Sequence, residues 1–157
     1  MPTITPFLWF NDNAEAAVNF YVSIFKNSKV LDVSRYGEGG PMPAGTAMIV
    51  NFLHDEREYM ALNGGPDLKL NEAFSLFVSV DTQEEVDGLW KKFTDGGEEV
   101  QCGWLKDRYG LSWQIVPTAL GKLMGDPDPV KSQRVMQAML HMKKLDIAVL
   151  QLAYEGK

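Results

Sequence analysis

The stretch GWLKDRYGLSWQIVP, residues 103–117, decides which fold the sequence predicts. It contains two tryptophans, a charged turn over residues 107–110 and an apolar strand that ends in proline. Because successive strand residues point to opposite faces, Trp113 and Ile115 share one face and Gln114 points to the other. A polar amide in the middle of an apolar strand therefore predicts a sheet face that is not part of the hydrophobic core.

The patterns around this stretch predict the same order of elements twice. In the first half, a strand, a helix and three more strands are predicted over residues 4–10, 14–25, 29–36, 46–53 and 58–62. The second half repeats that order over residues 74–80, 82–93, 99–102, 104–107 and 112–116. Asn13 is the expected N-cap of the first helix, and Thr82 and Glu85 form a capping box for the second.

The chain is therefore predicted to be an α+β protein with two βαβββ modules and a helical tail. Its 157 residues suit one domain. Module one is expected over about residues 3–66, module two over about 73–117 and the tail over about 118–157. Asp128-Pro129 is a typical helix start, and about two helices are expected in the tail. The methionine-rich apolar stripe of the tail is more typical of a core or a subunit interface than of a ligand site.

The net charge and the cysteine content limit which partners and which cell compartment are expected. The net charge of −6 argues against nucleic acid and anionic membranes as partners. The single cysteine, Cys102, excludes an intramolecular disulfide and is expected to be a small buried residue. The sequence starts without a signal-peptide pattern and holds no apolar run of about 18 residues, so we expect a cytoplasmic protein.

Several motifs resemble one superfamily. They are TPFLWF at 5–10, NAEAA at 13–17 followed by Phe20-Tyr21, GWLKD at 103–107, Gly110, WQIVP at 113–117 and KLDIA at 144–148. Together with the paired modules they resemble the vicinal oxygen chelate superfamily, which includes glyoxalases, bleomycin-binding proteins and extradiol dioxygenases. The subgroup looks like the PhnB-like family, often labelled demethylubiquinone methyltransferase. The resemblance covers about residues 3–117.

The resemblance implies that each module curls into a cup, with a helix on one sheet face and a cavity on the other. Strand alternation then gives the residues expected to face the cavity and contact a ligand: Thr5, Phe7, Trp9, Ser75, Phe77, Ser79 and Gln114. Trp104 is expected either in the core or at the cavity, where a planar ligand could stack on its ring. Asp107 is expected either in a surface turn or at the pocket rim.

The resemblance also implies a metal site, which the sequence lacks. The four ligand positions of the superfamily correspond to Thr5, Ala61, Ser75 and Gln114, and only the last is a plausible ligand. A catalytic metal normally needs about three protein ligands. The two histidines, His54 in a predicted turn and His141 in the tail, lie on no cavity strand. We therefore expect no metal and no other cofactor.

The favoured hypothesis is a binding protein for a small, partly apolar or aromatic molecule. Bleomycin-binding relatives work without a catalytic metal, so the fold permits this function. The alternative is a metal-dependent or metal-independent enzyme of lyase, isomerase or dioxygenase type, with Glu38, Asp107 or a neighbouring subunit supplying groups. Methyl transfer is not expected, because no glycine-rich cofactor loop is present. A homodimer is expected whose interface includes the tail after Pro127. The ligand and the pathway stay open.

Overall fold

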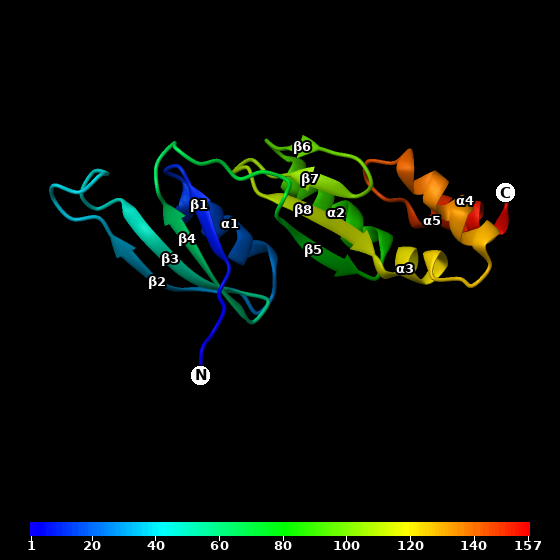
Figure 1. Cartoon of the computed structure of the whole chain (residues 1–157), viewed down its shortest axis with the longest axis horizontal. Helices are drawn as coiled ribbons and strands as arrows, with labels where there is room; N and C mark the ends of the chain where they lie inside the picture. Colours follow the sequence, from blue (N-terminus) through cyan, green and yellow to red (C-terminus); the bar gives the residue numbers. More distant parts are fainter. The chain divides into compact units, whose positions relative to one another are not determined.

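The computed structural model of the chain describes every residue from Met1 to Lys157. The chain divides into two compact units, Met1–Leu70 and Asn71–Lys157, which follow each other along the colour scale of Figure 1. The boundary lies between residue 66, where module one is predicted to end, and residue 73, where module two is predicted to begin. Each module therefore forms within its own unit.

The first unit is a mixed four-stranded sheet with one helix. Its elements are β1 (Phe7–Phe10), α1 (Ala14–Ile24), β2 (Lys29–Arg35), β3 (Ala47–His54) and β4 (Arg57–Asn63). The strand order is β1-β4-β3-β2. The outer strand β1 runs parallel to β4, and the other pairs are antiparallel.

The second unit repeats this topology. Its module consists of β5 (Ser75–Val80), α2 (Gln83–Thr94), β6 (Glu98–Glu99), β7 (Trp104–Lys106) and β8 (Ser112–Pro117). The strand order is β5-β8-β7-β6, with β5 parallel to β8. The two sheets have the same order and the same parallel pair, so the predicted α+β class with two βαβββ modules is confirmed (Figure 1).

The tail contains three helices rather than the two predicted. They are α3 (Thr118–Met124), α4 (Pro129–Leu140) and α5 (Ile147–Glu155). Helix α3 was not predicted because it continues directly from β8 without a side-chain cap and has a glycine inside it. Helix α4 begins at Asp128-Pro129, as predicted. In both α4 and α5, an aspartate at the N-cap accepts a hydrogen bond from a backbone amide of the first turn.

The tail packs within its own unit. Its helices share a core formed by Leu120, Val135, Leu145 and Leu150. The side-chain amide of Gln83, at the start of α2, donates to the carbonyl of Leu145 and accepts from the amide of Ile147, at 3.0 and 2.8 Å. The amides of Cys102 and Gly103 donate to the carbonyls of Met142 and Lys143, both at 2.8 Å. The tail is thus docked on module two of the same chain.

Helix α1 covers one face of the first sheet, packing on β3 and β4. The buried side chains between them are Leu8, Phe10, Val50, Phe52, Tyr59 and Ala61 from the strands and Ala14, Ala17, Val18 and Tyr21 from the helix. They include every second residue of β1, as the alternation at Leu8 and Phe10 predicts. The predicted strand start at residue 4 is wrong, because β1 begins at Phe7 and Ile4 is fully exposed.

The start of helix α1 is capped by a distant residue. Asn13 lies at the N-cap position, as predicted, but its side chain makes no capping hydrogen bond. Instead, the buried Oδ1 of Asn63, at the end of β4, accepts from the amide of Ala14 at 2.8 Å. The Nδ2 of Asn63 donates to the carbonyl of Ala47 at 2.9 Å. One buried amide therefore ties α1, β3 and β4 together, because all its polar atoms are used.

In the second unit the core is built on Trp113. Its side chain is fully buried and stacks on Phe93 of α2, with ring centroids 4.4 Å apart. The indole Nε1 donates to Oδ2 of Asp107 at 2.9 Å. The other oxygen, Oδ1, accepts from the amides of Tyr109 and Leu111 at 2.8 and 3.1 Å.

These bonds correct one of the two roles considered for Asp107. The residue is 3% exposed, and its carboxylate lies on the side of the sheet that Trp113 occupies, against α2. Its oxygens are used to hold the turn between β7 and β8. Asp107 is therefore not a pocket-rim residue; it begins the predicted turn, as a buried acceptor that fixes the backbone of that turn.

A buried histidine lies at the far end of β3. His54 is 8% exposed and packs edge-on against Phe25, with ring centroids 4.6 Å apart, and against Tyr59. Burial lowers the pKa of His54 below its ordinary value, and the nearby Asp55 carboxylate opposes that shift only in part. Near neutral pH, burial therefore favours the neutral form of this imidazole in the folded chain.

We predict that Asp107→Asn destabilises the chain by about 1–3 kcal/mol, because an amide nitrogen would face a buried N–H donor in either rotamer. Urea denaturation monitored by tryptophan fluorescence measures this. Asp95→Asn is the matched control, since Asp95 forms an exposed ion pair with Arg108 at 3.0 Å and should contribute under about 1 kcal/mol. Equal losses in the two variants would contradict the role given to Asp107.

The second prediction concerns pH. The unfolded chain binds a proton at His54 near the ordinary pKa of about 6.5, whereas the folded chain does not until a lower pH. The free energy of unfolding should therefore fall as the pH drops from 7.5 to 5.5. His54→Phe should flatten this dependence, whereas His141→Gln, at an exposed position, should preserve it. A slope that survives His54→Phe would show that another group is responsible.

Candidate functional site

Each sheet has one face that its helix does not cover, which we call the open face. Strand alternation and register assign the side chains. In the first unit they are Phe7, Trp9, Asp32, Ser34, Ile49, Asn51, Met60 and Leu62. In the second unit they are Ser75, Phe77, Ser79, Trp104, Lys106, Ser112, Gln114 and Val116. The open faces therefore contain most of the residues that the sequence predicts at a ligand.

On the first open face the aromatic side chains are prominent. Phe7 is 50% exposed, although it is a large apolar residue on a strand. Trp9 is half-buried, and its Nε1 donates to the carbonyl of Gly65 at 3.0 Å. A Cβ atom at Gly64 would lie 2.4 Å from the Trp9 ring, so the indole rests directly on this backbone. Thr5 precedes β1 and is half-buried.

The register corrects the position matched to Ala61. Ala61 pairs with Leu8 and Val50, is fully buried and faces helix α1. Its neighbours Met60 and Leu62 are the β4 residues on the open face, where they pair with Phe7 and Trp9. The sequence reading was off by one residue here because a short apolar strand such as YMALN carries little alternation.

The second open face centres on Gln114. In the register of the sheet, Gln114 lies between Phe77 on β5 and Trp104 on β7. Phe77 is 58% exposed, and Trp104 is half-buried on the face opposite the buried Leu105. The Nε2 of Gln114 donates to Oγ of Ser75 at 3.0 Å. Trp104 thus lies on the open face rather than in the core; whether it contacts a ligand stays a prediction.

The remaining polar groups lie around this row. Ser79 is exposed on the open face, next to Val116 on β8. Lys106 pairs in register with the buried Ser112, and its Nζ lies 3.9 Å from Oε2 of Glu72. The sequence reading did not include Lys106. Lys106 lies two residues after Trp104 on the same strand, and this spacing alone predicts that both side chains share one face.

The residues of the open faces do not fit a catalytic metal. No group of three or more His, Cys, Asp and Glu side chains is arranged to hold an ion. At the positions matched to the ligands of the superfamily, the chain presents two hydroxyls, one amide and, on β4, the apolar open-face neighbours of Ala61, Met60 and Leu62. Zinc and iron sites use imidazole, thiolate or carboxylate, and this donor set has none of them. Neither His54 nor His141 lies on an open face.

The other groups considered in the sequence also lie away from the open faces. Glu38 is exposed in the loop between β2 and β3. Cys102 is half-buried rather than buried and has a positive φ of 60°. Its predicted burial is wrong because it lies in a turn rather than in a strand. The backbone amide of this turn donates to the carbonyl of Met142 in the tail.

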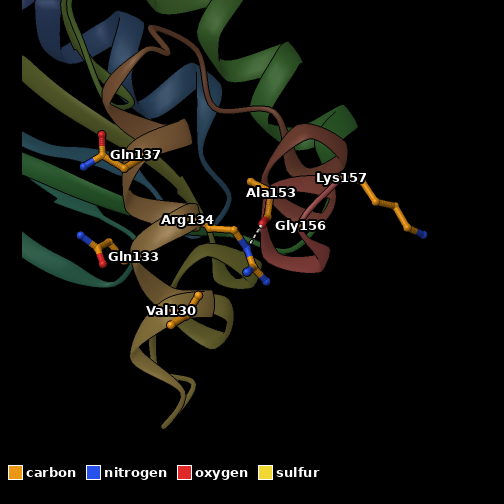
Figure 2. A pocket seen from close by; sticks show the side chains of 7 residues that line it. All are labelled: Val130, Gln133, Arg134, Gln137, Ala153, Gly156 and Lys157. Carbon is orange, nitrogen blue, oxygen red and sulfur yellow. Dashed lines mark hydrogen bonds between the residues drawn. The ribbon is translucent and has the colours of Figure 1, made fainter.

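A separate groove of about 580 Å³ lies on the tail (Figure 2). It is lined by Val130, Gln133, Arg134, Gln137, Ala153, Gly156 and Lys157. Arg134 donates to the carbonyls of Ala153 and Tyr154 at 2.9 and 2.6 Å and so caps the end of α5. Lys157 forms an ion pair with Glu155 at 3.1 Å. The charged groups of this groove thus already serve the packing of α5. As for membranes, none of the helices combines the length and hydropathy that a bilayer span requires.

Comparison with known proteins covers both modules. A model of the 3-demethylubiquinone-9 3-methyltransferase family matches residues 2–116. No curated protein matches the chain. The match ends before α3, so the tail, with the KLDIA motif at 144–148, lies outside it.

Solved structures agree with the family match. A Bacillus cereus PhnB protein, provisionally assigned as a 3-demethylubiquinone-9 3-methyltransferase, shares 34% identity and a TM-score of 0.69, over 74% of this chain and 100% of that one. A Pseudomonas aeruginosa protein shares 21% identity and a TM-score of 0.61, over 74% and 98%. A proposed glyoxalase of Bacillus cereus shares 11% identity, a TM-score of 0.51 and coverages of 74% and 98%, which shows the fold alone. With its two βαβββ modules, the chain therefore belongs to the PhnB-like, 3-demethylubiquinone-9 3-methyltransferase-like family of the vicinal oxygen chelate superfamily.

Proposed function

We propose that this chain binds a small, partly apolar molecule on the open faces of its sheets and that it does so without a catalytic metal. The observation that carries the proposal is the row Phe77, Gln114 and Trp104. Two large aromatic side chains flank one neutral amide on a face that the helix of the module leaves uncovered. Ligand sites are commonly lined by apolar and aromatic groups with a few placed polar groups, which is the composition found here.

The exposed aromatic area supports binding energetically. Phe7 and Phe77 are half or more exposed in the free chain. Because each side chain is already about half buried, covering the remainder with a ligand is worth roughly 1 kcal/mol before the cost of association. Trp9 rests on the backbone of Gly64 and donates to Gly65, so its ring loses little further freedom on binding. A preorganised aromatic surface favours an apolar ligand for both reasons.

The alternative is an enzyme, and the family name favours this reading because it states methyl transfer. Nucleotide-type cofactors commonly bind at a glycine-rich turn between a strand and a helix in a parallel sheet. Here the turns before α1 and α2 read Asn11-Asp12-Asn13 and Asp81-Thr82, without glycine, and both sheets are mixed. The residues therefore support methyl transfer less well than binding. A reaction of lyase, isomerase or dioxygenase type stays the competing proposal.

We predict that aromatic or quinone-like compounds raise the melting temperature of the full chain in a thermal-shift screen. Phe77→Ala should lower the affinity for the best compound by about tenfold, because it removes one of the two aromatic side chains of the row. Phe74→Ala is the matched control: Phe74 is also exposed, but it precedes β5 and lies outside the row. Affinity should change little in this variant.

Two outcomes would contradict the proposal. One is a screen in which no compound of this class shifts the melting temperature. The other is stoichiometric zinc, iron, manganese or nickel that stays bound to the purified protein through dialysis, which would favour the metalloenzyme. Elemental analysis of the dialysed protein measures this directly, and we expect less than stoichiometric metal.

We also propose that the chain forms a homodimer through its tail. Although the tail packs on its own unit, four of its large apolar side chains are 45% exposed or more: Val130, Leu140, Val149 and Leu152. Val149 and Leu152 lie three residues apart on α5, and adjacent exposed apolar groups are typical of an interface between proteins. A second copy of the chain offers the same surface, as a twofold interface requires.

The prediction is that the double variant Val149→Glu and Leu152→Glu is a folded monomer, whereas the parent chain is a dimer. These residues are three apart on α5 and share one face, so two charges there would oppose burial. Light scattering after gel filtration gives the mass, and circular dichroism checks the fold. Gln151→Glu, on the same helix, is the control and should stay dimeric. If the double variant has the same mass as the parent chain, the tail is not part of the dimer interface.

A further inference from the structure

The open face of the second unit has an aromatic row and, next to it, a polar row. Phe77, Gln114 and Trp104 form the first row, and Ser75, Ser112 and Lys106 form the second. The rows are two residues apart along the strands, or about 7 Å. A planar ligand that lies against the aromatic row can therefore reach the polar row with a single substituent.

The polar group nearest the aromatic row is the hydrogen-bonded pair of Gln114 and Ser75. Nε2 of Gln114 donates to Oγ of Ser75, which leaves Oε1 of Gln114 to accept and the Ser75 hydroxyl to donate. If the amide is turned around, it accepts from the hydroxyl, and the pair still offers an amide donor and a hydroxyl acceptor. In both arrangements the pair presents at least one donor and one acceptor.

This pair carries no charge, and the carboxylates nearby outnumber the one cation. Lys106 is the only basic residue on this open face, and its Nζ already lies 3.9 Å from the carboxylate of Glu72. Glu98 on β6 pairs in register with Lys106 and adds a second carboxylate at the edge. A ligand carboxylate would therefore lose its water without gaining a free cation, which is costly.

From these observations we propose the ligand class of this site: an uncharged planar aromatic molecule whose substituent both donates and accepts hydrogen bonds, such as a primary amide. The ring lies against Phe77 and Trp104, and the substituent meets Gln114 and Ser75. The proposal rests on the proposed binding function and deepens it. It excludes aromatic acids as the preferred ligands, since the face has donors and acceptors but no uncompensated cation.

Three naphthalenes of nearly equal shape test the proposal by titration calorimetry: 2-naphthamide, 2-acetylnaphthalene and 2-naphthoate. The amide donates and accepts, the ketone only accepts, and the acid is an anion at neutral pH. We expect the ketone to bind about 3- to 10-fold more weakly than the amide, because it leaves a hydrogen-bonding group of the pair unsatisfied. We expect the anion to bind at least about tenfold more weakly than the amide.

Variants assign these differences to named residues. Gln114→Leu should abolish the preference for the amide over the ketone while ketone binding persists, since leucine preserves the apolar contact. Glu72→Gln should selectively raise the affinity for 2-naphthoate, because it frees Lys106. Gln133→Leu, an exposed glutamine on α4, is the control and should leave all three affinities unchanged.

The outcomes separate this proposal from the binding function itself. If none of the three compounds binds, the binding function fails at this site and the ligand class fails with it. If all three bind but 2-naphthoate equals or exceeds 2-naphthamide, binding stands and the proposed class is wrong. If Gln114→Leu keeps the amide preference, the pair is not the group that selects the ligand. Tightest binding of the amide with loss of its preference in Gln114→Leu supports the proposal.

Discussion

The fold of the second unit depends on one buried hydrogen bond, in which the indole of Trp113 donates to the carboxylate of Asp107. The same carboxylate accepts from two amides of the turn between β7 and β8, so the turn and the strand after it are fixed together. Trp113 is thereby held against Phe93 of α2. Because side chains alternate, Gln114 must then point to the open face. A slip of one residue would exchange the two faces and bury the amide.

Asn63 performs a comparable task in the first unit with different chemistry. Its amide accepts from the start of α1 and donates to β3, so the helix is held to the sheet face that it covers. Both buried polar side chains have their hydrogen-bonding atoms paired, so their burial stabilises the fold rather than opposing it. The polar side chains of the open faces do not hold α1 or α2 to the sheets in this way. Several of them instead hydrogen-bond to one another on the same face, as Asn51 does with Asp32 and Gln114 with Ser75.

The open faces carry few of the side chains that commonly hold a transition metal. The positions matched to metal ligands carry hydroxyls, an amide and, on β4, apolar side chains, which are poor ligands for zinc or iron. The aromatic residues around them suit an apolar ligand. The proposed binding function uses this scaffold, with a helix behind each sheet and an uncovered face in front, and needs no metal centre. The tail adds three helices to the second unit, beyond the region matched by the family.

The sequence by itself determined the repeated order of elements, the capping box at Thr82 and the faces of Trp113 and Gln114, because these follow from local periodicity and local hydrogen bonds. Tertiary structure alone decided the cap of α1 by Asn63, the burial of Asp107 and the face of Ala61. The partners of Asn63 lie 16 and 49 residues away, so no local pattern encodes those bonds. The turn at Asp107 reads as exposed because its residues are polar. Only the packing of Trp113 on α2 brings the indole N–H to the carboxylate and places both in the core.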